Sequence, residues 1–154
     1  MQKNQTTIEF HNSLPADVAK LMQEDMVAYE TSKGIDVNYK TFCLILRDEN
    51  QQVCGVLNAF TAFAEIYIDD MWVHHQHRGK GYGKRLLQAL EEQFQGKGFN
   101  NINLVTSAFQ APEFYKKCGF IVEFIRENTK NPKLTKTFLI KYFKDEIQKQ
   151  GILE

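Results

Sequence analysis

Three alternating glycines stand directly before a run of residues with helical periodicity, in the segment HRGKGYGKRLL at positions 77–87. Before the glycines, the run AEIYIDDMWV over residues 64–73 is rich in the β-branched and aromatic residues that favour strands. After them, apolar residues at helical spacing predict an amphipathic helix over Lys84–Gln95: Leu87, Leu90 and Phe94. The chain is therefore predicted to pass from a strand into a helix through a basic turn in which alternate residues are glycines without side chains.

A turn of this kind suits an anionic ligand. The first amides of a helix have no intrahelical acceptor, and the helix dipole makes that end attractive to negative charge. Glycines let a phosphate approach the main chain without interference from Cβ atoms. Arg78, Lys80 and Lys84 add positive charge. The predicted ligand is a phosphate or a pyrophosphate.

Two other phosphate-binding patterns do not fit the turn. A Walker A loop requires GxxxxGK[ST], but Arg85 follows Gly83 and Lys84, and the earlier glycine would fall at Arg78. A Rossmann fingerprint requires GxGxxG, and its third glycine would fall at Lys84. The residues alone leave open the alternative that this is a turn without a ligand.

Length and composition favour one domain over residues 1–154, with 43% hydrophobic and 25% charged residues. No apolar run could cross a membrane, and the N-terminal MQKNQTTIEF lacks the apolar core of a signal peptide. The three cysteines are odd in number and too widely spaced for a disulfide framework or a zinc site: Cys43, Cys54 and Cys118. We therefore expect a cytoplasmic protein with reduced thiols and no bound metal.

The net charge of zero conceals two halves of opposite sign. Residues 1–73 carry five Lys/Arg against eleven Asp/Glu, and residues 74–154 carry fourteen against eight. Such a division suits one cationic and one anionic ligand, although an uneven scatter of surface charge produces the same numbers. A nucleic-acid partner is not expected, because such proteins are usually basic overall with a basic stripe.

The order of the remaining patterns predicts a mixed sheet with helices on both faces, an α/β (α+β) fold. Helices are expected over residues 13–34, Lys84–Gln95 and Pro112–Lys117. Strands are expected over Thr6–Asn12, Thr41–Arg47, Val53–Phe60, Ala64–Val73, Ile102–Thr106, and residues 120–126 and 136–143. The polar tail from Lys144 either frays or extends the last strand.

Two spaced motifs carry a family resemblance. RGKGYG at residues 78–83 has the form [RQ]-x-x-G-x-[GA], with MWV before it and KRLL after it. FQAPEFYKKCGF follows at residues 109–120. Together they resemble the acetyl-CoA signature and the closing segment of the GNAT acetyltransferase superfamily. The residues FQAPEFYKK are similar to those of a bacterial subgroup of small members. The resemblance implies a mostly antiparallel sheet of about six to seven strands in a GNAT-like fold.

The resemblance also implies where acetyl-CoA binds. The co-substrate would lie in a V between the parallel strands Ala64–Val73 and Ile102–Thr106, with main-chain groups of Met71 and Val73 binding its pantetheine arm. The segment from Arg78 to Lys84 would cradle the pyrophosphate. The residues expected at the cofactor are Met71, Trp72, Val73, Arg78, Gly79, Lys80, Gly81, Tyr82, Gly83, Lys84, Ser107 and Phe114. Ser107 or Gln110 would replace an asparagine that many relatives carry, and Trp72 is expected in the core beside the cofactor.

Direct attack of an amine on the thioester needs a proton acceptor and a proton donor. Tyr115 matches the family tyrosine beside the CoA sulfur and is the expected general acid. Asp69 and Glu65 are the expected bases, with Asp70 third, because carboxylates within so apolar a strand are unusual. By alternation Glu65 and Asp69 share one face, unless a bulge exchanges the faces. A structural hydrogen bond is the alternative for each carboxylate.

The expected function is therefore an N-acetyltransferase that moves an acetyl group from acetyl-CoA to a primary amine of a small molecule. A protein or peptide acceptor and a non-catalytic CoA-binding module are the alternatives. No metal is expected, because His74, His75 and His77 have no further Cys or His residues at the spacing of metal ligands. Cys118 is expected to pack in the protein interior. No membrane or nucleic-acid partner is expected, and the chain would act as a monomer or a homodimer.

Overall fold

The computed structural model describes residues 5–144 and divides the chain into two compact units, residues 1–37 and 38–154. In the first unit, α1 spans Ala16–Ser32, with Asp17 in its first turn. Gly34, at a φ of 72°, follows its end, as the sequence predicts. None of the described helices is long and apolar enough to cross a membrane. The expected single domain stays a prediction, and the tail after Lys144 lies outside the described residues.

The strand predicted over Thr6–Asn12 is wrong, because these residues have no strand structure. Alternating apolar and polar residues supply the side-chain pattern of a strand. A strand also needs backbone hydrogen bonds to a neighbour. All strands of the described sheet begin at Lys40 or later, and none of them pairs with this segment.

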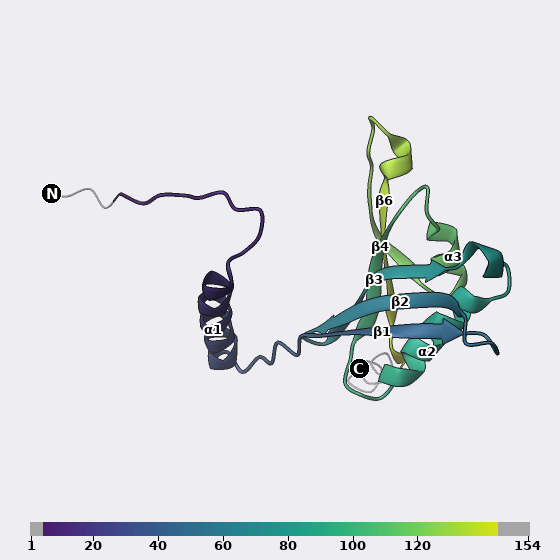
Figure 1. Cartoon of the computed structure of the whole chain (residues 1–154), viewed down its shortest axis with the longest axis horizontal. Helices are drawn as coiled ribbons and strands as arrows, with labels where there is room; N and C mark the ends of the chain where they lie inside the picture. The colour runs from purple at the N-terminus through teal and green to yellow at the C-terminus, as the bar shows by residue number, and fades with distance from the viewer. Residues whose placement is uncertain (1–4, 145–154) are drawn as a thin grey trace, which may run out of the picture. The chain divides into compact units, whose positions relative to one another are not determined.

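The second unit contains one sheet of six strands in the order β1-β2-β3-β4-β6-β5 (Figure 1). Every neighbouring pair is antiparallel except β3 and β4, which are parallel. The strands are β1 (Lys40–Arg47), β2 (Val53–Ala62), β3 (Glu65–Val73), β4 (Asn101–Ser107), β5 (Ile121–Arg126) and β6 (Lys136–Tyr142). The predicted mixed, mostly antiparallel sheet is confirmed.

The parallel strands β3 and β4 pair only at their first residues. The register joins Glu65–Tyr67 to Asn101–Asn103 and then stops, although both strands continue. Asn100 closes this end, because its N–H donates to the Ala64 carbonyl at 2.7 Å and its carbonyl accepts from the Phe143 N–H at 3.1 Å. Beyond this closed end the two strands diverge.

One hydrophobic core joins the sheet to the helices. The helices are α2 (Tyr82–Phe94) and α3 (Pro112–Lys117), with short 3₁₀ turns at His75–His77 and Pro132–Leu134. The buried face of α2 consists of Leu86, Leu87 and Leu90. These leucines belong to the same cluster as Leu57, Ile66, Ile102, Tyr115 and Leu139. Helix α2 begins two residues before the predicted Lys84, since the poor helix propensity of Gly83 hid its first turn.

Replacing Leu90, whose side chain is fully buried, should destabilise the protein strongly. We expect Leu90→Ala to lower the free energy of unfolding by about 2–5 kcal/mol, because it leaves a cavity in the core. Leu134→Ala removes the same atoms from a side chain that is 44% exposed, and should change stability by less than about 0.5 kcal/mol. Equal losses in urea denaturation of the two variants would contradict this placement of the core.

Candidate functional site

The divergence of β3 and β4 opens a cavity of about 260 Å³. One wall consists of the last residues of β3 that follow the paired segment, and the other of β4 and the start of α3. The lining residues are Ile68, Asp69, Asp70, Met71, Trp72, Leu104, Val105, Thr106, Gln110, Ala111, Phe114 and Tyr115. Main-chain groups along the open strand edges have no partner strand there, so an extended ligand could hydrogen-bond to them.

A bulge in β3 brings two carboxylates to this cavity. The register with β2 joins Asn58 to Asp70 and the next residue, Ala59, to Ile68, so Asp69 is the extra residue. The Asn58 side-chain amide donates to the Asp70 carboxylate at 3.4 Å. Both Asp69 and Asp70 are exposed and line the cavity. The alternation that predicted opposite faces for them is broken at this bulge.

Glu65 lies elsewhere, at the closed end of the two strands. Its carboxylate accepts a hydrogen bond from the Tyr67 hydroxyl and another from the Asn101 side-chain amide at 3.0 Å. The bond to Glu65, together with burial, raises the pKa of Tyr67 to about 12. Asn101 in turn accepts from the Asn103 amide at 2.8 Å. Glu65 is therefore tied into a polar network that joins the paired strands, and it does not line the cavity.

Tyr115 reaches the cavity from α3 and is 7% exposed. Burial, with a smaller contribution from the nearby Cys118 thiol, raises the pKa of Tyr115 from 10.0 to about 12. Its hydroxyl therefore carries a proton throughout the neutral range. Burial also raises the pKa of Cys118, whose side chain packs against the core as the sequence predicts.

The glycine turn forms a second cavity of about 400 Å³ that adjoins the first. Gly79 and Gly81 have φ values of 77° and 80°, a region that side chains disfavour. Gly81 is the N-cap of α2, and no capping side chain is hydrogen-bonded to the first amides of this helix. The lining residues are Met71, Val73, His77, Arg78, Gly79, Gly81, Tyr82, Gly83, Ala111 and Phe114. Met71, Ala111 and Phe114 line both cavities.

The two cavities bring together most, but not all, of the predicted cofactor residues. Lys80, Lys84 and Ser107 line neither cavity. Lys80 and Lys84 are exposed beside the second one, in the glycine turn and the first turn of α2. The Ser107 N–H instead donates to the Gln110 side-chain oxygen at 2.9 Å. The Arg78 guanidinium donates to the Val73 carbonyl at 3.3 Å.

The expectation that Trp72 lies in the core is wrong. Its side chain is 42% exposed and lines the first cavity. Because Trp72 follows the bulge, its face is set by the register shift, which the sequence pattern does not reveal. Sequence reasoning also missed five lining residues, which lie where β3, β4 and α3 face the opening: Ile68, Leu104, Val105, Thr106 and Ala111. The signal that could have found them is their position in or next to the two strands predicted to form the V-shaped opening.

Known proteins resemble this chain in sequence and in fold. The model of the acetyltransferase (GNAT) family matches residues 9–120. An acetyltransferase of Agrobacterium fabrum is 25% identical over 105 residues, which make up 68% of this chain and 77% of that protein. The crystal structure of an acetyltransferase from Bacillus cereus has 24% identity and a TM-score of 0.71, over 88% of this chain and 98% of that one.

A third structure, of a proposed streptothricin acetyltransferase from Bacillus anthracis, was solved in complex with acetyl coenzyme A. It is 23% identical, with a TM-score of 0.59, over 67% of this chain and 62% of that one. At this identity the two solved structures are evidence for the fold.

The third glycine of the turn is required by packing. A Cβ atom at Gly83 would lie 2.9 Å from the ring of Phe114. We expect Gly83→Ala to displace this ring, at a cost of about 1–3 kcal/mol that outweighs the better helix propensity of alanine. In a Phe114→Leu background the same substitution should be at least about 0.5 kcal/mol less harmful. Additive effects in a double-mutant cycle of thermal unfolding would show that the two residues do not touch.

Proposed function

This chain belongs to the acetyltransferase (GNAT) family, and from that premise we propose that it transfers an acetyl group from acetyl-CoA to a primary amine of a small molecule. The observation that carries the proposal is the pair of adjoining cavities. One is an open strand edge with two carboxylates and a buried tyrosine, and the other is a basic turn before an uncapped helix. The first cavity suits the thioester end of acetyl-CoA and the second suits its diphosphate. The residues shared by the two cavities would lie along the extended arm between them.

The first part of the proposal concerns the co-substrate. The diphosphate would meet the first amides of α2 and the side chains of Arg78, Lys80 and Lys84, which supply both hydrogen bonds and positive charge. The pantetheine arm would run past Met71 and Phe114, which line both cavities, to the opening between β3 and β4. The acetyl coenzyme A in the Bacillus anthracis structure supports this choice of donor.

The second part concerns the protons. A neutral amine attacks the thioester carbonyl, the new C–N bond forms, and the C–S bond breaks to release a thiolate. An amine is mostly protonated at neutral pH, so a base must accept one proton, and the product nitrogen must lose another. Asp69 is proposed as that base, directly or through a water molecule, because it lines the cavity while Glu65 is engaged in a polar network.

Tyr115 is proposed to assist the departing sulfur. A full proton transfer from a phenol of pKa about 12 to a thiolate of reference pKa about 8.5 is uphill by about 5 kcal/mol. Hydrogen bonding is therefore the larger part of its contribution. A hydrogen bond to a charged group is worth about 1.5–3 kcal/mol, and the thiolate then takes its proton from solvent.

The acceptor is proposed to be a small cationic amine. Asp69 and Asp70 place two carboxylates at the cavity, which attracts positive charge. A volume of about 260 Å³, shared with the end of the pantetheine arm, suits a small molecule. The test is release of CoA thiol from acetyl-CoA in the presence of diamines, amino sugars and a lysine peptide. Faster release with the lysine peptide than with any small amine would instead favour a peptide acceptor.

Removing the tyrosine hydroxyl should slow the reaction without changing its pH profile. We expect Tyr115→Phe to lower kcat about 10- to 100-fold, since it removes one hydrogen bond to the thiolate. Because the pKa of Tyr115 is raised to about 12, its proton is present in the ordinary working range and lost only as the pH rises toward that value. Wild type should therefore show no Tyr115-dependent fall in rate below about pH 10.

Tyr142→Phe is the matched control, because Tyr142 lies on β6 outside both cavities. A wild-type rate for Tyr115→Phe, or an alkaline fall that this substitution abolishes, would contradict the proposed role.

The three carboxylates should differ in their effect on rate. We expect Asp69→Asn to lower kcat by about 10²- to 10⁴-fold, the usual range for a positioned base. Glu65→Gln keeps an acceptor for the Asn101 amide and should retain most activity. Asp70→Asn removes a negative charge next to Asp69 but leaves the proposed base in place. Its effect on kcat therefore measures the contribution of local charge without that of proton transfer. A larger loss in Glu65→Gln than in Asp69→Asn would reverse the assignment.

A further inference from the structure

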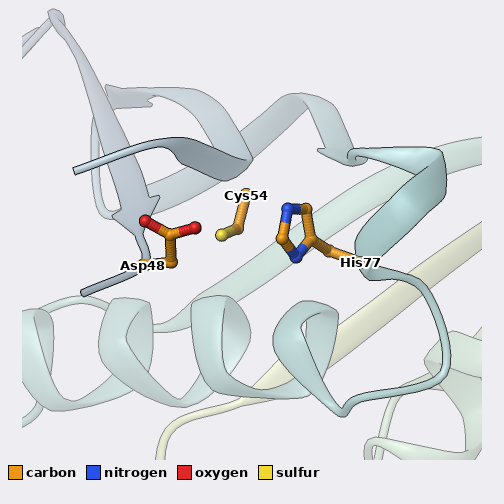
Figure 2. A group of neighbouring side chains, drawn as sticks. All are labelled: Asp48, Cys54 and His77. Atoms are coloured by element: carbon orange, nitrogen blue, oxygen red, sulfur yellow. The ribbon is translucent and has the colours of Figure 1, made fainter. Parts of the chain in front are cut away.

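Three side chains with metal-binding atoms meet outside the cavity between β3 and β4 (Figure 2). Asp48 lies in the turn after β1, Cys54 lies near the start of β2, and His77 ends the 3₁₀ turn before the glycines. Their ligand atoms all lie within 4.8 Å of one another. In Figure 2 the Cys54 sulfur stands between the Asp48 carboxylate and the His77 ring.

The partial burial of this cluster is the second observation, because Asp48 and His77 are half-buried around the buried Cys54. Cys54 is fully buried, and its thiol donates a hydrogen bond to the Gln52 carbonyl at 3.6 Å, so its sulfur lone pairs remain for a ligand. The Nδ1 atom of His77 is buried and has no hydrogen-bond partner. Buried polar atoms are nearly always paired, so an unpaired ring nitrogen on a histidine of this cluster needs an explanation. A metal ion that accepts the lone pair of this nitrogen provides one.

Hydrogen bonds hold the Asp48 side chain and the main chain at Cys54 and His77. One Asp48 carboxylate oxygen accepts from the N–H groups of Asn50 at 2.8 Å and Gln52 at 2.9 Å. The second oxygen has no bond to these amides. The N–H of His74 donates to the Cys54 carbonyl at 2.8 Å, and the N–H of His77 donates to the His74 carbonyl at 2.8 Å. The cluster is therefore already assembled around a fixed backbone.

We propose that Asp48, Cys54 and His77 form a binding site for a divalent ion of the zinc class. A thiolate and an imidazole select such ions over Mg²⁺ and Ca²⁺, which prefer oxygen ligands alone. Two anionic ligands and one neutral ring balance the charge of the ion, and the thiol proton passes to solvent on binding. With bonds of about 2.0–2.3 Å, tetrahedral ligand atoms lie about 3.3–3.8 Å apart. The present ligand atoms, all within 4.8 Å of one another, would reach that range by side-chain rotation, and water would take the fourth position.

Such an ion would fasten the turn after β1 and the start of β2 to the segment that leads into the glycine turn. His77 adjoins Arg78 and also lines the cavity at that turn. The effect expected from the ion is therefore a more stable entry into the glycine turn. The inference does not depend on acetyl transfer, and its test needs no substrate.

The test is titration of the purified full chain with Co²⁺, a spectroscopic substitute for Zn²⁺. We expect one equivalent to produce a thiolate-to-cobalt charge-transfer band and the visible bands of a tetrahedral site. Zn²⁺ should abolish these bands by competition, and a large excess of Mg²⁺ should not. Zn²⁺ should also raise the thermal unfolding temperature of the wild type in a concentration-dependent way.

Ligand variants and matched controls identify the site. Cys54→Ser should remove the charge-transfer band, and His77→Gln and Asp48→Asn should each weaken Co²⁺ binding at least about tenfold. The amide oxygen introduced by Asp48→Asn would still accept from the Asn50 and Gln52 N–H groups, so the turn is kept and only the anionic ligand is lost. His75→Gln and Cys118→Ser should leave the bands unchanged.

Two results overturn the proposal. One is the absence of a charge-transfer band with Co²⁺ up to millimolar concentration. The other is a band that persists in His77→Gln and Asp48→Asn but disappears when Cys43 or Cys118 is replaced. If Cys54→Ser does not fold, the other two ligand variants decide the outcome, once circular dichroism shows that they fold without metal.

Discussion

The loss of pairing between β3 and β4 is the feature on which the rest of the site depends. Three residues on each strand are joined, Glu65–Tyr67 to Asn101–Asn103, and the strands then diverge. The polar network around Glu65 and the backbone bonds of Asn100 hold the closed end, while β2 and β6 support the outer edges. The open edges therefore remain available to a ligand without loosening the sheet.

The diverging strands are also packed against helix α2, which carries the proposed diphosphate site. Helix α2 packs its leucines under the sheet, so its first turn is fixed relative to the end of β3. Gly83 allows Phe114 to pack against that turn, and Phe114 is shared by the two cavities. An anion at the first amides of α2 and a thioester between the strands would then be held by one rigid body, which favours a reaction that depends on orientation.

Much of this arrangement could be predicted from the sequence, for identifiable physical reasons. Periodicity located α2 and β3, and the glycines located the turn before α2, because these signals are local. Anion binding at that turn stays a prediction. The side of the strand on which Asp70 and Trp72 lie was not predictable, since one bulge resets it. The strand expected at Thr6–Asn12 failed because pairing is not a local property. The meeting of Asp48, Cys54 and His77 depends on three elements, so no spacing pattern reveals it.

The central claim is that bare amides at the start of α2 bind the diphosphate of CoA, and calorimetric titration of CoA tests it most directly. Gly81→Ala and Gly81→Glu impose the same strain on a residue with a φ of 80°, and they differ in the size and charge of the new side chain. The account predicts that CoA binds to the wild type, binds more weakly to Gly81→Ala, and binds at least about tenfold more weakly again to Gly81→Glu. Pantetheine, which lacks the diphosphate, should bind the three proteins alike. Equal affinity of CoA for the two variants would contradict the claim.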